Sequence, residues 1–225
     1  MFTFIKPNWP ASDNVHAITT TVGCDCAENV SRKLLREQLN LPSEPIWLEQ
    51  QHSIEVIDLS QKLVNSSVDG AYTNQIDTVC AVLTADCLPI LLCSKNGREI
   101  AAIHAGWRGL LNGVIASGVR RFKCQPGELL AWLGPAISQQ AFEVGSEVRE
   151  EFLRRDKEAA AAFKPSQKPG HWLADLYQLA RQRLNKLGVH KIYGGDFCTY
   201  TDHERFYSYR RDNQTGRMAT LIWRK

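Results

Sequence analysis

The 225 residues contain 44% hydrophobic and 23% charged side chains, proportions that are ordinary for a globular protein with a full core. The net charge of +3 is too small to predict a nucleic-acid partner, although a local basic cluster can bind a small anion. No apolar run approaches the ~20 residues that span a bilayer, and the first ten residues do not resemble a signal peptide, so we expect a cytoplasmic protein without a membrane partner.

The seven cysteines are an odd number, and Cys80 and Cys93 lie inside apolar runs where a thiol packs as a small hydrophobic group. We therefore expect reduced thiols, in agreement with a cytosolic compartment. Cys24 and Cys26 are separated by one residue, which is too close for an easy disulfide and is only a weak metal signal, so the sequence favours a surface loop there. No repeat or linker interrupts the chain, and we predict one domain over residues 1–225.

Hydrophobic periodicity and turn residues predict the secondary structure. In chain order, the predicted elements are a strand over 15–22, a helix over 27–40, strands over 46–50, 55–59, 79–83 and 99–103, a helix over 109–123, a strand over 129–133, a turn over 142–145, helices over 146–163 and 173–187, and strands over 191–195, 206–209 and 219–223. A hairpin turn over residues 212–216 is predicted between the last two strands.

Strands and helices interleave without a strict βαβ repeat, and strands follow one another directly at both ends of the chain. This order predicts an α/β or α+β fold, a layered sandwich with mixed β-sheets flanked by helices. The glycine-rich fingerprints of nucleotide-binding folds are absent from the sequence.

Three residues with reactive side chains each follow a predicted strand: His52, Cys87 and His104. Two imidazoles and one thiolate suit Zn²⁺ or copper, and three protein ligands leave a fourth position open, as in catalytic zinc sites. Their spacing is not a recognised metal pattern, so two other interpretations stay open. Cys87 can be a nucleophile with a histidine base, although the neighbouring Asp86 should raise its pKa. Alternatively, all three side chains are buried structural groups.

Two further segments suggest anion binding. Arg108 lies between glycines at the start of a predicted helix, where backbone N–H groups and a guanidinium can hold phosphate or carboxylate. Near the C-terminus, three aromatic residues accompany Arg210, Arg211 and Arg217, a combination that can stack a base and hold a phosphate. The alternatives are a core tryptophan with a surface arginine in the first segment, and an edge hairpin with solvated charges in the second.

The motifs at these residues occur in an order that resembles a known family. They are Trp47-Leu-Glu-Gln-Gln-His52, Thr84-Ala-Asp-Cys87-Leu-Pro, Ala102-Ile-His104-Ala-Gly-Trp-Arg-Gly109, Gly134-Pro-Ala-Ile137, Phe142-Glu-Val-Gly145, Cys198-Thr-Tyr, Tyr209-Arg-Arg-Asp and Thr215-Gly-Arg217. From about residue 40 to the C-terminus, the chain closely resembles the YfiH-type family, whose members are variously called laccase-domain, polyphenol oxidase or purine nucleoside phosphorylase proteins.

The resemblance implies a catalytic zinc site made by His52, Cys87 and His104, in a layered α/β protein that is usually monomeric. It implies phosphorolysis of adenosine, inosine, guanosine and methylthioadenosine, and deamination of adenosine. Phosphate would be steered by Arg108 and Arg210, and Arg32 matches a further arginine of the family pattern. The older family label is a copper-dependent polyphenol oxidase, and some relatives are linked to removal of misincorporated amino acids from peptidoglycan precursors.

The start of the chain departs from the family pattern. Relatives carry an Arg-x-Gly-Gly and a Ser-Leu-Asn-Leu segment after the first strand, whereas here Thr19-Thr-Thr21 runs directly into Val22-Gly-Cys-Asp25. The segment that should help to hold substrate or phosphate is therefore missing from the sequence.

Three other functions remain alternatives at this stage. Copper oxidase chemistry on phenols fits poorly, because a blue-copper site uses an axial methionine and the chain has only two methionines and six histidines. A metal-free cysteine hydrolase acting on an amide, including a peptidoglycan precursor, would use Cys87 as nucleophile. A protein that binds a ligand without turnover is the third, and the shortened N-terminal segment favours it.

Overall fold

The computed structural model describes residues 2–61 and 67–225 of the chain. Thirteen strands in the described ranges form three sheets. The four-stranded sheet has the order β1 (Phe4–Ile5), β2 (Val15–Thr20), β13 (Met218–Arg224), β5 (Cys80–Thr84). The six-stranded sheet has the order β12 (Lys191–Gly194), β8 (Leu129–Leu133), β6 (Leu88–Ser94), β7 (Ile100–Ala105), β4 (Gly70–Thr73), β3 (Val56–Asp58). The small sheet contains β10 (Phe163–Pro165), β11 (His171–Ala174) and β9 (Glu143–Gly145).

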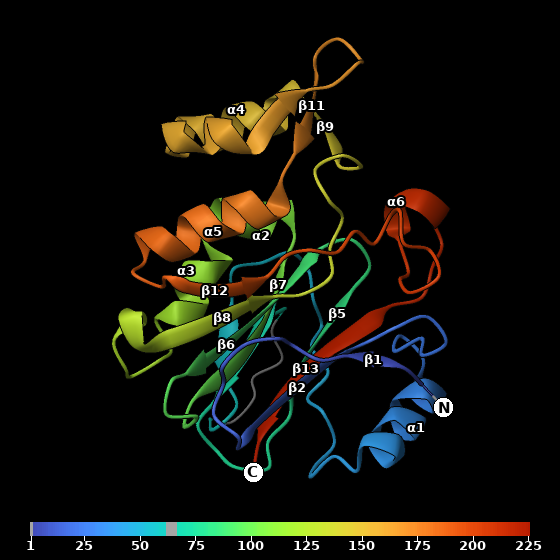
Figure 1. Ribbon diagram of the computed structural model, residues 1–225, viewed down its shortest axis with the longest axis vertical. Helices are drawn as coiled ribbons and strands as arrows, with labels where there is room; N and C mark the ends of the chain where they lie inside the picture. Colours follow the sequence, from blue (N-terminus) through green and yellow to red (C-terminus); the bar gives the residue numbers. More distant parts are fainter. Residues whose placement is uncertain (1, 62–66) are drawn as a thin grey trace.

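Helices cover the outer faces of this arrangement (Figure 1). The α-helices of the described ranges are α1 (Asn29–Leu39), α2 (Trp107–Asn112), α3 (Val114–Val119), α4 (Ser146–Arg155), α5 (Leu176–Lys186) and α6 (Tyr209–Asp212), with 3₁₀ turns η1 (Pro126–Glu128) and η2 (Lys157–Ala162). None of the described helices is long and apolar enough to cross a membrane.

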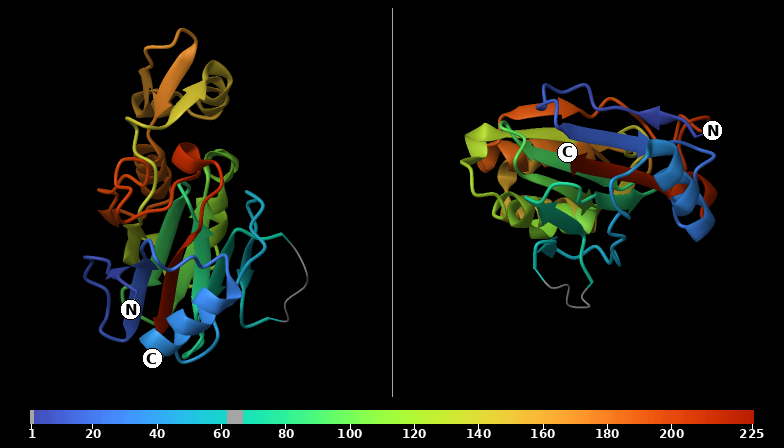
Figure 2. Two further views of the ribbon diagram at one scale, coloured as in Figure 1. Left: turned by 90° about the vertical axis from the view of Figure 1, so that its right-hand side faces the viewer. Right: turned by 90° about the horizontal axis from the view of Figure 1, so that it is seen from below.

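The two larger sheets pack face to face, and strand β7 shows how. Successive side chains of a strand point to opposite faces. Ile103 and Ala105 of β7 lie in the core under α2, α3 and α5, whereas Ile100 and Ala102 lie in a second core against β5 and β13. A third core joins the four-stranded sheet to Leu35 of α1. The chain is therefore a layered sandwich, and the left view of Figure 2 shows α4 and the small sheet at one end of it.

The six-stranded sheet is mixed, as the order of the predicted elements suggested, whereas the other two sheets are antiparallel. β12 pairs with β8, and β3 with β4, in parallel, while the other neighbouring strands run antiparallel. The last strand, β13, lies between β2 and β5, so residues from both ends of the chain meet in one sheet (Figure 1). The predicted layered α/β fold is confirmed.

Several local predictions are wrong. The helix predicted over 109–123 is two short helices, because Gly113 adopts φ 107° between α2 and α3. The predicted helix over 146–163 ends at Arg155, and η2 and β10 follow it. Residues 171–174 form β11 before α5 begins, and the predicted turn over 142–145 contains β9.

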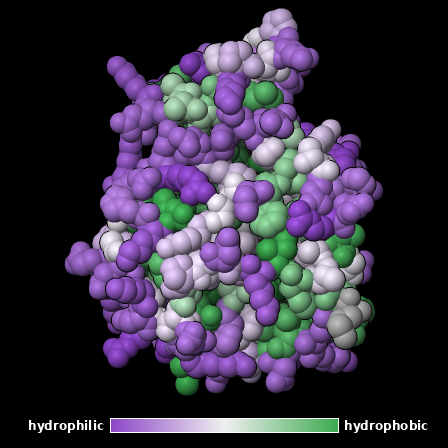
Figure 3. Space-filling view, viewed as in Figure 1, coloured by the Kyte–Doolittle hydropathy of each residue, from purple (hydrophilic) through white to green (hydrophobic). Residues whose placement is uncertain are grey.

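Two predicted strands are also absent from the described part of the chain. In the segment 46–50, only Ile46 makes a bridge, to Cys80. Residues 206–208 are irregular and α6 begins at Tyr209, so the predicted strand and the predicted hairpin over 212–216 do not form. On the face seen in Figure 3, hydrophilic side chains cover the end that carries α4 and the small sheet, and hydrophobic groups gather nearer the four-stranded sheet.

Candidate metal centre

Cys87 lies in the turn between β5 and β6 and is half-buried. The residue before it, Asp86, has φ 86°, a left-handed conformation that is uncommon outside glycine. Its carboxylate accepts hydrogen bonds from Thr199 Oγ1 and from the backbone N–H of Arg210, both at 2.6 Å. The C-terminal part of the chain therefore fixes the turn that presents Cys87.

His104 is a buried residue of β7, and the buried Asp69 holds its ring. The Asp69 Oδ1 atom lies 2.6 Å from His104 Nδ1, and the backbone N–H of His104 donates to the Asp69 carbonyl. The same carboxylate accepts the backbone N–H groups of Gln51, His52 and Ser53. Asp69 thus anchors both the histidine of β7 and the loop that carries His52, and it leaves His104 Nε2 free.

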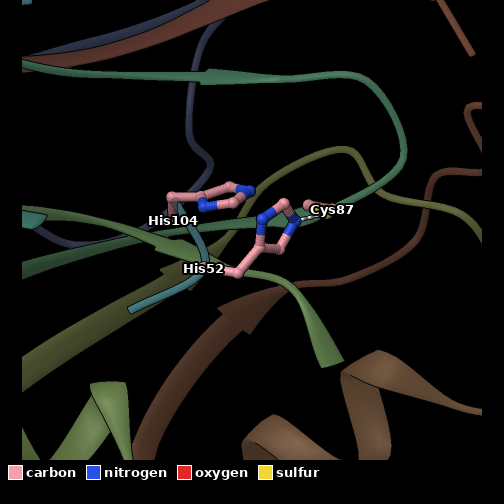
Figure 4. Close-up of side chains that lie close together, drawn as sticks. All are labelled: His52, Cys87 and His104. Atoms are coloured by element: carbon pink, nitrogen blue, oxygen red, sulfur yellow. Dashed lines mark hydrogen bonds between the residues drawn. The ribbon is translucent and has the colours of Figure 1, made fainter. Parts of the chain in front are cut away.

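His52 lies in the loop before β3 with φ 60°. Gln50 secures this loop, because its side-chain amide accepts from the N–H of Leu83 and donates to the Leu83 carbonyl. The His52 Nε2 atom lies 3.6 Å from Cys87 Sγ, and the His52 and His104 rings are 4.9 Å apart at 73°. Figure 4 shows the imidazole of His52 turned toward Cys87, with His104 beside it.

The three side chains predicted from the sequence therefore meet. One ligand atom from each of His52, Cys87 and His104 lies within 4.8 Å of the other two. Gly106 makes room for them, since a Cβ atom at this position would lie 2.6 Å from His52 Cδ2 and 3.1 Å from Cys87 Sγ. The glycine after β7 is thus a steric requirement of the cluster.

The cluster polarises its own groups. Burial raises the pKa of the Cys87 thiol, but hydrogen bonds to His104 and His52 and their charge lower it to about 6. Burial lowers the pKa of His104, but Asp69 and Cys87 raise it to about 9. Burial raises the pKa of Asp69, but hydrogen bonds from His104 and Ser53 lower it to about 2. The expectation that Asp86 raises the thiol pKa is wrong, because its carboxylate is bound to Thr199 and Arg210.

These donors fit a zinc ion. Zinc binds thiolate at about 2.3 Å and imidazole at about 2.0–2.1 Å, so the sulfur and nitrogen of a tetrahedral site lie about 3.6 Å apart. The 3.6 Å between His52 Nε2 and Cys87 Sγ matches this spacing. Three ligands leave one coordination position for a water or substrate.

A cavity of about 740 Å³ opens onto the three side chains. This volume lies within the range of small-molecule sites. The arginines predicted to bind phosphate, Arg32, Arg108 and Arg210, all line it, and so does Arg217. Arg211 is used elsewhere, donating to the carbonyls of Thr199, Tyr200 and Phe206 and to Asp212.

Aromatic groups accompany these arginines. The Arg108 guanidinium stacks on Trp107 with its Cζ 4.4 Å from the ring centroid, and Arg32 stacks on Trp47 at the same distance. Arg210 lies 5.3 Å from the Phe142 ring centroid, and its Nη1 donates to the Glu143 carbonyl. Stacking uses the face of a guanidinium and leaves N–H groups on its edge for an anion.

Over residues 18–225, the sequence matches the family model described as multi-copper polyphenol oxidoreductase laccase. The chain belongs to this laccase-like YfiH family. It is 48% identical to the protein of Escherichia coli (strain K12) named purine nucleoside phosphorylase YfiH, over 99% of each chain. It is 46% identical to a Haemophilus influenzae protein named purine nucleoside phosphorylase, over 97% of this chain and 98% of the relative.

Solved structures of family members have the same fold. A Neisseria meningitidis protein, 40% identical, superimposes with a TM-score of 0.90 over 99% of both chains. YlmD from Geobacillus stearothermophilus, 26% identical, gives 0.86 over 99% of this chain and 96% of its own. The Escherichia coli alignment spans 243 positions against the 225 residues of this chain, so at least 18 aligned positions have no counterpart here. In this chain, eight residues, 21–28, connect β2 to α1.

Two residues of the site, Asp69 and Gln50, were missed in the sequence. Asp69 stands in a turn-rich segment with nothing to mark it, and Gln50 acts only through its contact with β5. Arg217 was noted beside aromatics, yet its place in the cavity depends on the pairing of its backbone with Asp25 and Cys26. A carboxylate partner for a metal-binding histidine is a common feature, and that rule is the one signal pointing to an acidic residue near His104.

Proposed function

We propose that this protein is a zinc-dependent purine nucleoside phosphorylase that acts on adenosine, inosine, guanosine and methylthioadenosine and also deaminates adenosine. One observation carries the proposal: His52, Cys87 and His104 line a single cavity with Arg32, Arg108 and Arg210. The relatives named purine nucleoside phosphorylase support a nucleoside and phosphate as the occupants of that cavity.

The cavity residues divide by chemistry. Arginine edges at Arg108 and Arg210 bind the phosphate dianion, while Trp107 and Phe142 offer apolar faces to the purine. In phosphorolysis, a phosphate oxygen forms a bond to ribose C1′ as the bond from C1′ to the purine nitrogen breaks. In deamination, water adds at C6 and ammonia leaves. The two reactions require two poses, with the ribose near the arginines in one and C6 near the cluster in the other.

Asp69 keeps the proton on Nδ1 of His104, so that Nε2 is available as a ligand. Zinc held by His52, Cys87 and His104 would supply a Lewis acid for the charge that develops during either reaction. A cytoplasmic location suits Cys87, since the reducing compartment keeps thiols in the form that binds a metal. We propose that the protein works in that compartment as a monomeric, single-domain enzyme.

The test uses purified protein loaded with zinc and supplied with adenosine and phosphate. We expect inosine, adenine and ribose 1-phosphate as products, and loss of all three in Cys87→Ala. Cys124→Ala is the matched control, because Cys124 is also half-buried but lies outside the cavity lining. Unchanged rates in Cys87→Ala would contradict the proposal.

Copper-dependent oxidation of phenols is a second candidate, favoured by the description of the family model. The donor set of one thiolate and two imidazoles accepts copper as well as zinc. Elemental analysis after purification without added metal distinguishes the two. If the purified protein contains one equivalent of copper and oxidises phenols, its function is phenol oxidation and not zinc-dependent phosphorolysis.

A cysteine hydrolase acting on an amide, such as a peptidoglycan precursor, is the third candidate. The lowered pKa of Cys87 beside His104 favours it, because this is the arrangement of an activated thiol nucleophile. Such an activity would survive strong chelation and be lost on treatment with iodoacetamide. A zinc-dependent activity would instead be lost when the chelator removes the metal.

A further inference from the structure

Cys24 and Cys26 form a buried thiol pair in the short connection between β2 and α1. Neither residue is exposed, and their Sγ atoms lie 3.2 Å apart. The sequence favoured a surface loop here and argued against an easy disulfide. The burial of both thiols contradicts the first prediction, and the 3.2 Å between their sulfurs, which a small movement shortens to the disulfide length of about 2.05 Å, argues against the second. The residues around them are exposed, since Val22, Gly23 and Ala27 all face solvent. A small local opening of this turn therefore gives a small oxidant access to the sulfurs.

We propose that Cys24 and Cys26 are a reversible dithiol switch that hydrogen peroxide oxidises to a disulfide. Cys26 thiolate attacks one peroxide oxygen, the O–O bond breaks, and Cys26 becomes a sulfenic acid, while the departing hydroxide takes up the proton released by the Cys26 thiol and leaves as water. Cys24 sulfur then attacks Cys26 Sγ, the S–S bond forms, the S–O bond breaks, and a second water leaves. Two thiols lose two electrons to one peroxide, and a dithiol reductant reverses the change.

The hydrogen bonds of the pair assign these roles. The two sulfurs are hydrogen-bonded to each other, and Cys26 Sγ also lies 3.8 Å from Thr20 Oγ1 and 3.6 Å from the Cys24 carbonyl oxygen. The contacts with Cys24 and Thr20 lower the pKa of Cys26 against the opposing effects of burial and Asp25, whereas the contact with Cys26 and burial raise the pKa of Cys24. Cys26 is therefore the attacking sulfur and Cys24 the resolving one. By contrast, burial raises the pKa of Cys93 to about 12 and also raises that of Cys80, so these thiols are poor nucleophiles.

The pair is joined to the cavity through its backbone. Arg32 Nε donates to the Cys26 carbonyl at 2.8 Å, and the Cys26 N–H donates to the Arg217 carbonyl at 2.9 Å. The Arg217 N–H in turn donates to Asp25 Oδ1 at 2.8 Å. Arg32 and Arg217 both line the cavity. A disulfide must bring the two sulfurs from 3.2 Å to about 2.05 Å, and we expect the accompanying shift of residues 24–26 to displace both arginines.

The first experiment maps the bond and does not depend on turnover. Full-length zinc-loaded protein is treated with hydrogen peroxide, trapped with N-ethylmaleimide and digested for mass spectrometry. We expect a Cys24–Cys26 disulfide that dithiothreitol reverses, its absence in Cys24→Ser and Cys26→Ser, and its retention in Cys124→Ser. The proposal is overturned if both thiols stay reduced, if Cys26 passes to sulfinic acid, or if the pair binds zinc and is protected by it.

The second experiment tests the link to the cavity, which rests on the proposed function. Binding of inorganic phosphate is measured by calorimetry in the reduced and oxidised protein. We expect an affinity about tenfold lower after oxidation, the effect of losing one charge-assisted hydrogen bond. Cys24→Ser should show no change with peroxide. Equal phosphate affinity in the two states overturns the link, whereas failure of phosphorolysis alone leaves the disulfide map as the deciding result.

Discussion

Asp69 carries more of the site than any single ligand, because one carboxylate serves two of the three ligand positions. It binds His104 Nδ1 and three consecutive backbone N–H groups of the His52 loop. In Asp69→Asn, the negative charge disappears, and the amide NH₂ group would face a backbone donor. We expect zinc affinity to fall about 10- to 100-fold, the usual effect of removing the partner of a metal-binding histidine.

Competition with a chromophoric chelator measures this affinity directly. Asp77→Asn is the control, because Asp77 is an exposed residue with φ 59°, a conformation that asparagine tolerates. Circular dichroism shows whether the variant retains its fold. A folded Asp69→Asn protein with unchanged zinc affinity would mean that Asp69 does not position the ligands.

Gly106 gives a second test at the level of a single atom. Its backbone, at φ −68° and ψ 167°, suits any residue, so alanine adds only a methyl group. That methyl would lie 2.6 Å from His52 Cδ2, and His52 must move away from Cys87. We expect Gly106→Ala to lose zinc and activity by at least about tenfold while remaining folded, because a ligand is displaced rather than removed.

Gly127→Ala is the matched control for this prediction. Its added methyl would have its nearest neighbour at 3.9 Å, so no contact is disturbed. The zinc content of Gly127→Ala, measured by elemental analysis, and its rate of phosphorolysis should equal those of the parent protein. If the two alanine variants behave alike, the steric argument for Gly106 is wrong.

At this scale, the sequence predicted the three ligands but not their support. His52, Cys87 and His104 each follow a predicted strand, but the strand before His52 does not form, and β5 and β7 belong to different sheets, so the packing of the two sheets brings the three residues together. Asp69 could not be found the same way, since it lies 35 residues from His104 and acts only because β4 pairs with β7. Nor does a local pattern reveal that Cys24 and Cys26 are buried, because β13 and the backbone of Arg217 cover them.

Gly113 decides the shape of the element that follows the site. The apolar spacing over 109–123 predicts one helix, and it holds on both sides of the break, with Leu110 and Val114 buried. The spacing of apolar residues carries no information on backbone conformation. It therefore does not reveal that Gly113 ends α2 with φ 107°. The break turns α3 so that Gly118 packs on Ile103 of β7.

The Gly113→Ala variant isolates this conformational effect. No atom lies within 4 Å of the added Cβ, so the cost is the left-handed backbone alone, about 1–2 kcal/mol of unfolding free energy. Urea denaturation compares it with Gly127→Ala, which keeps an ordinary φ. An equal midpoint for the two variants would show that α2 and α3 can merge without loss.

The short strands were the hardest elements to predict, for a related reason. Strand β11 exists because Trp172 pairs with Val144 of β9, which is distant in sequence, and with Pro165 of the neighbouring β10. The sequences of β9 and β10 do not show the alternation of apolar and polar residues that predicts a strand. The aromatic run over 206–209 looks like a strand, yet Ser208 caps α6 by accepting the N–H of Arg211.

In the whole molecule, the order of the elements predicts the layered arrangement. It does not predict that the C-terminal strand returns to complete the sheet formed by the N-terminal strands. The C-terminal strand β13 completes the four-stranded sheet between β2 and β5. The segment before it supplies Arg210, whose N–H fixes Asp86 beside Cys87. The site thus depends on the last 25 residues being in place, which local patterns cannot predict.

This closure leads to a prediction about unfolding and metal removal. Three separate segments supply the ligands: the loop before β3, the β5–β6 turn and β7. Zinc that binds only the folded chain stabilises it by mass action. We expect one cooperative transition, with tryptophan fluorescence and far-ultraviolet circular dichroism coinciding, as for a single domain. A strong chelator should lower its midpoint by several degrees, roughly 2–4 °C for each kcal/mol of lost binding energy.

Cys87→Ala separates the metal from the other effects of the chelator. Without the thiolate, zinc binds weakly, so this variant should melt near the chelated parent protein and respond little to further chelation. Cys124→Ala should keep the full response, since Cys124 lies away from the cluster. Two resolved transitions would contradict a single domain. An equal chelator response in all three proteins would place the stabilising metal elsewhere than at His52, Cys87 and His104.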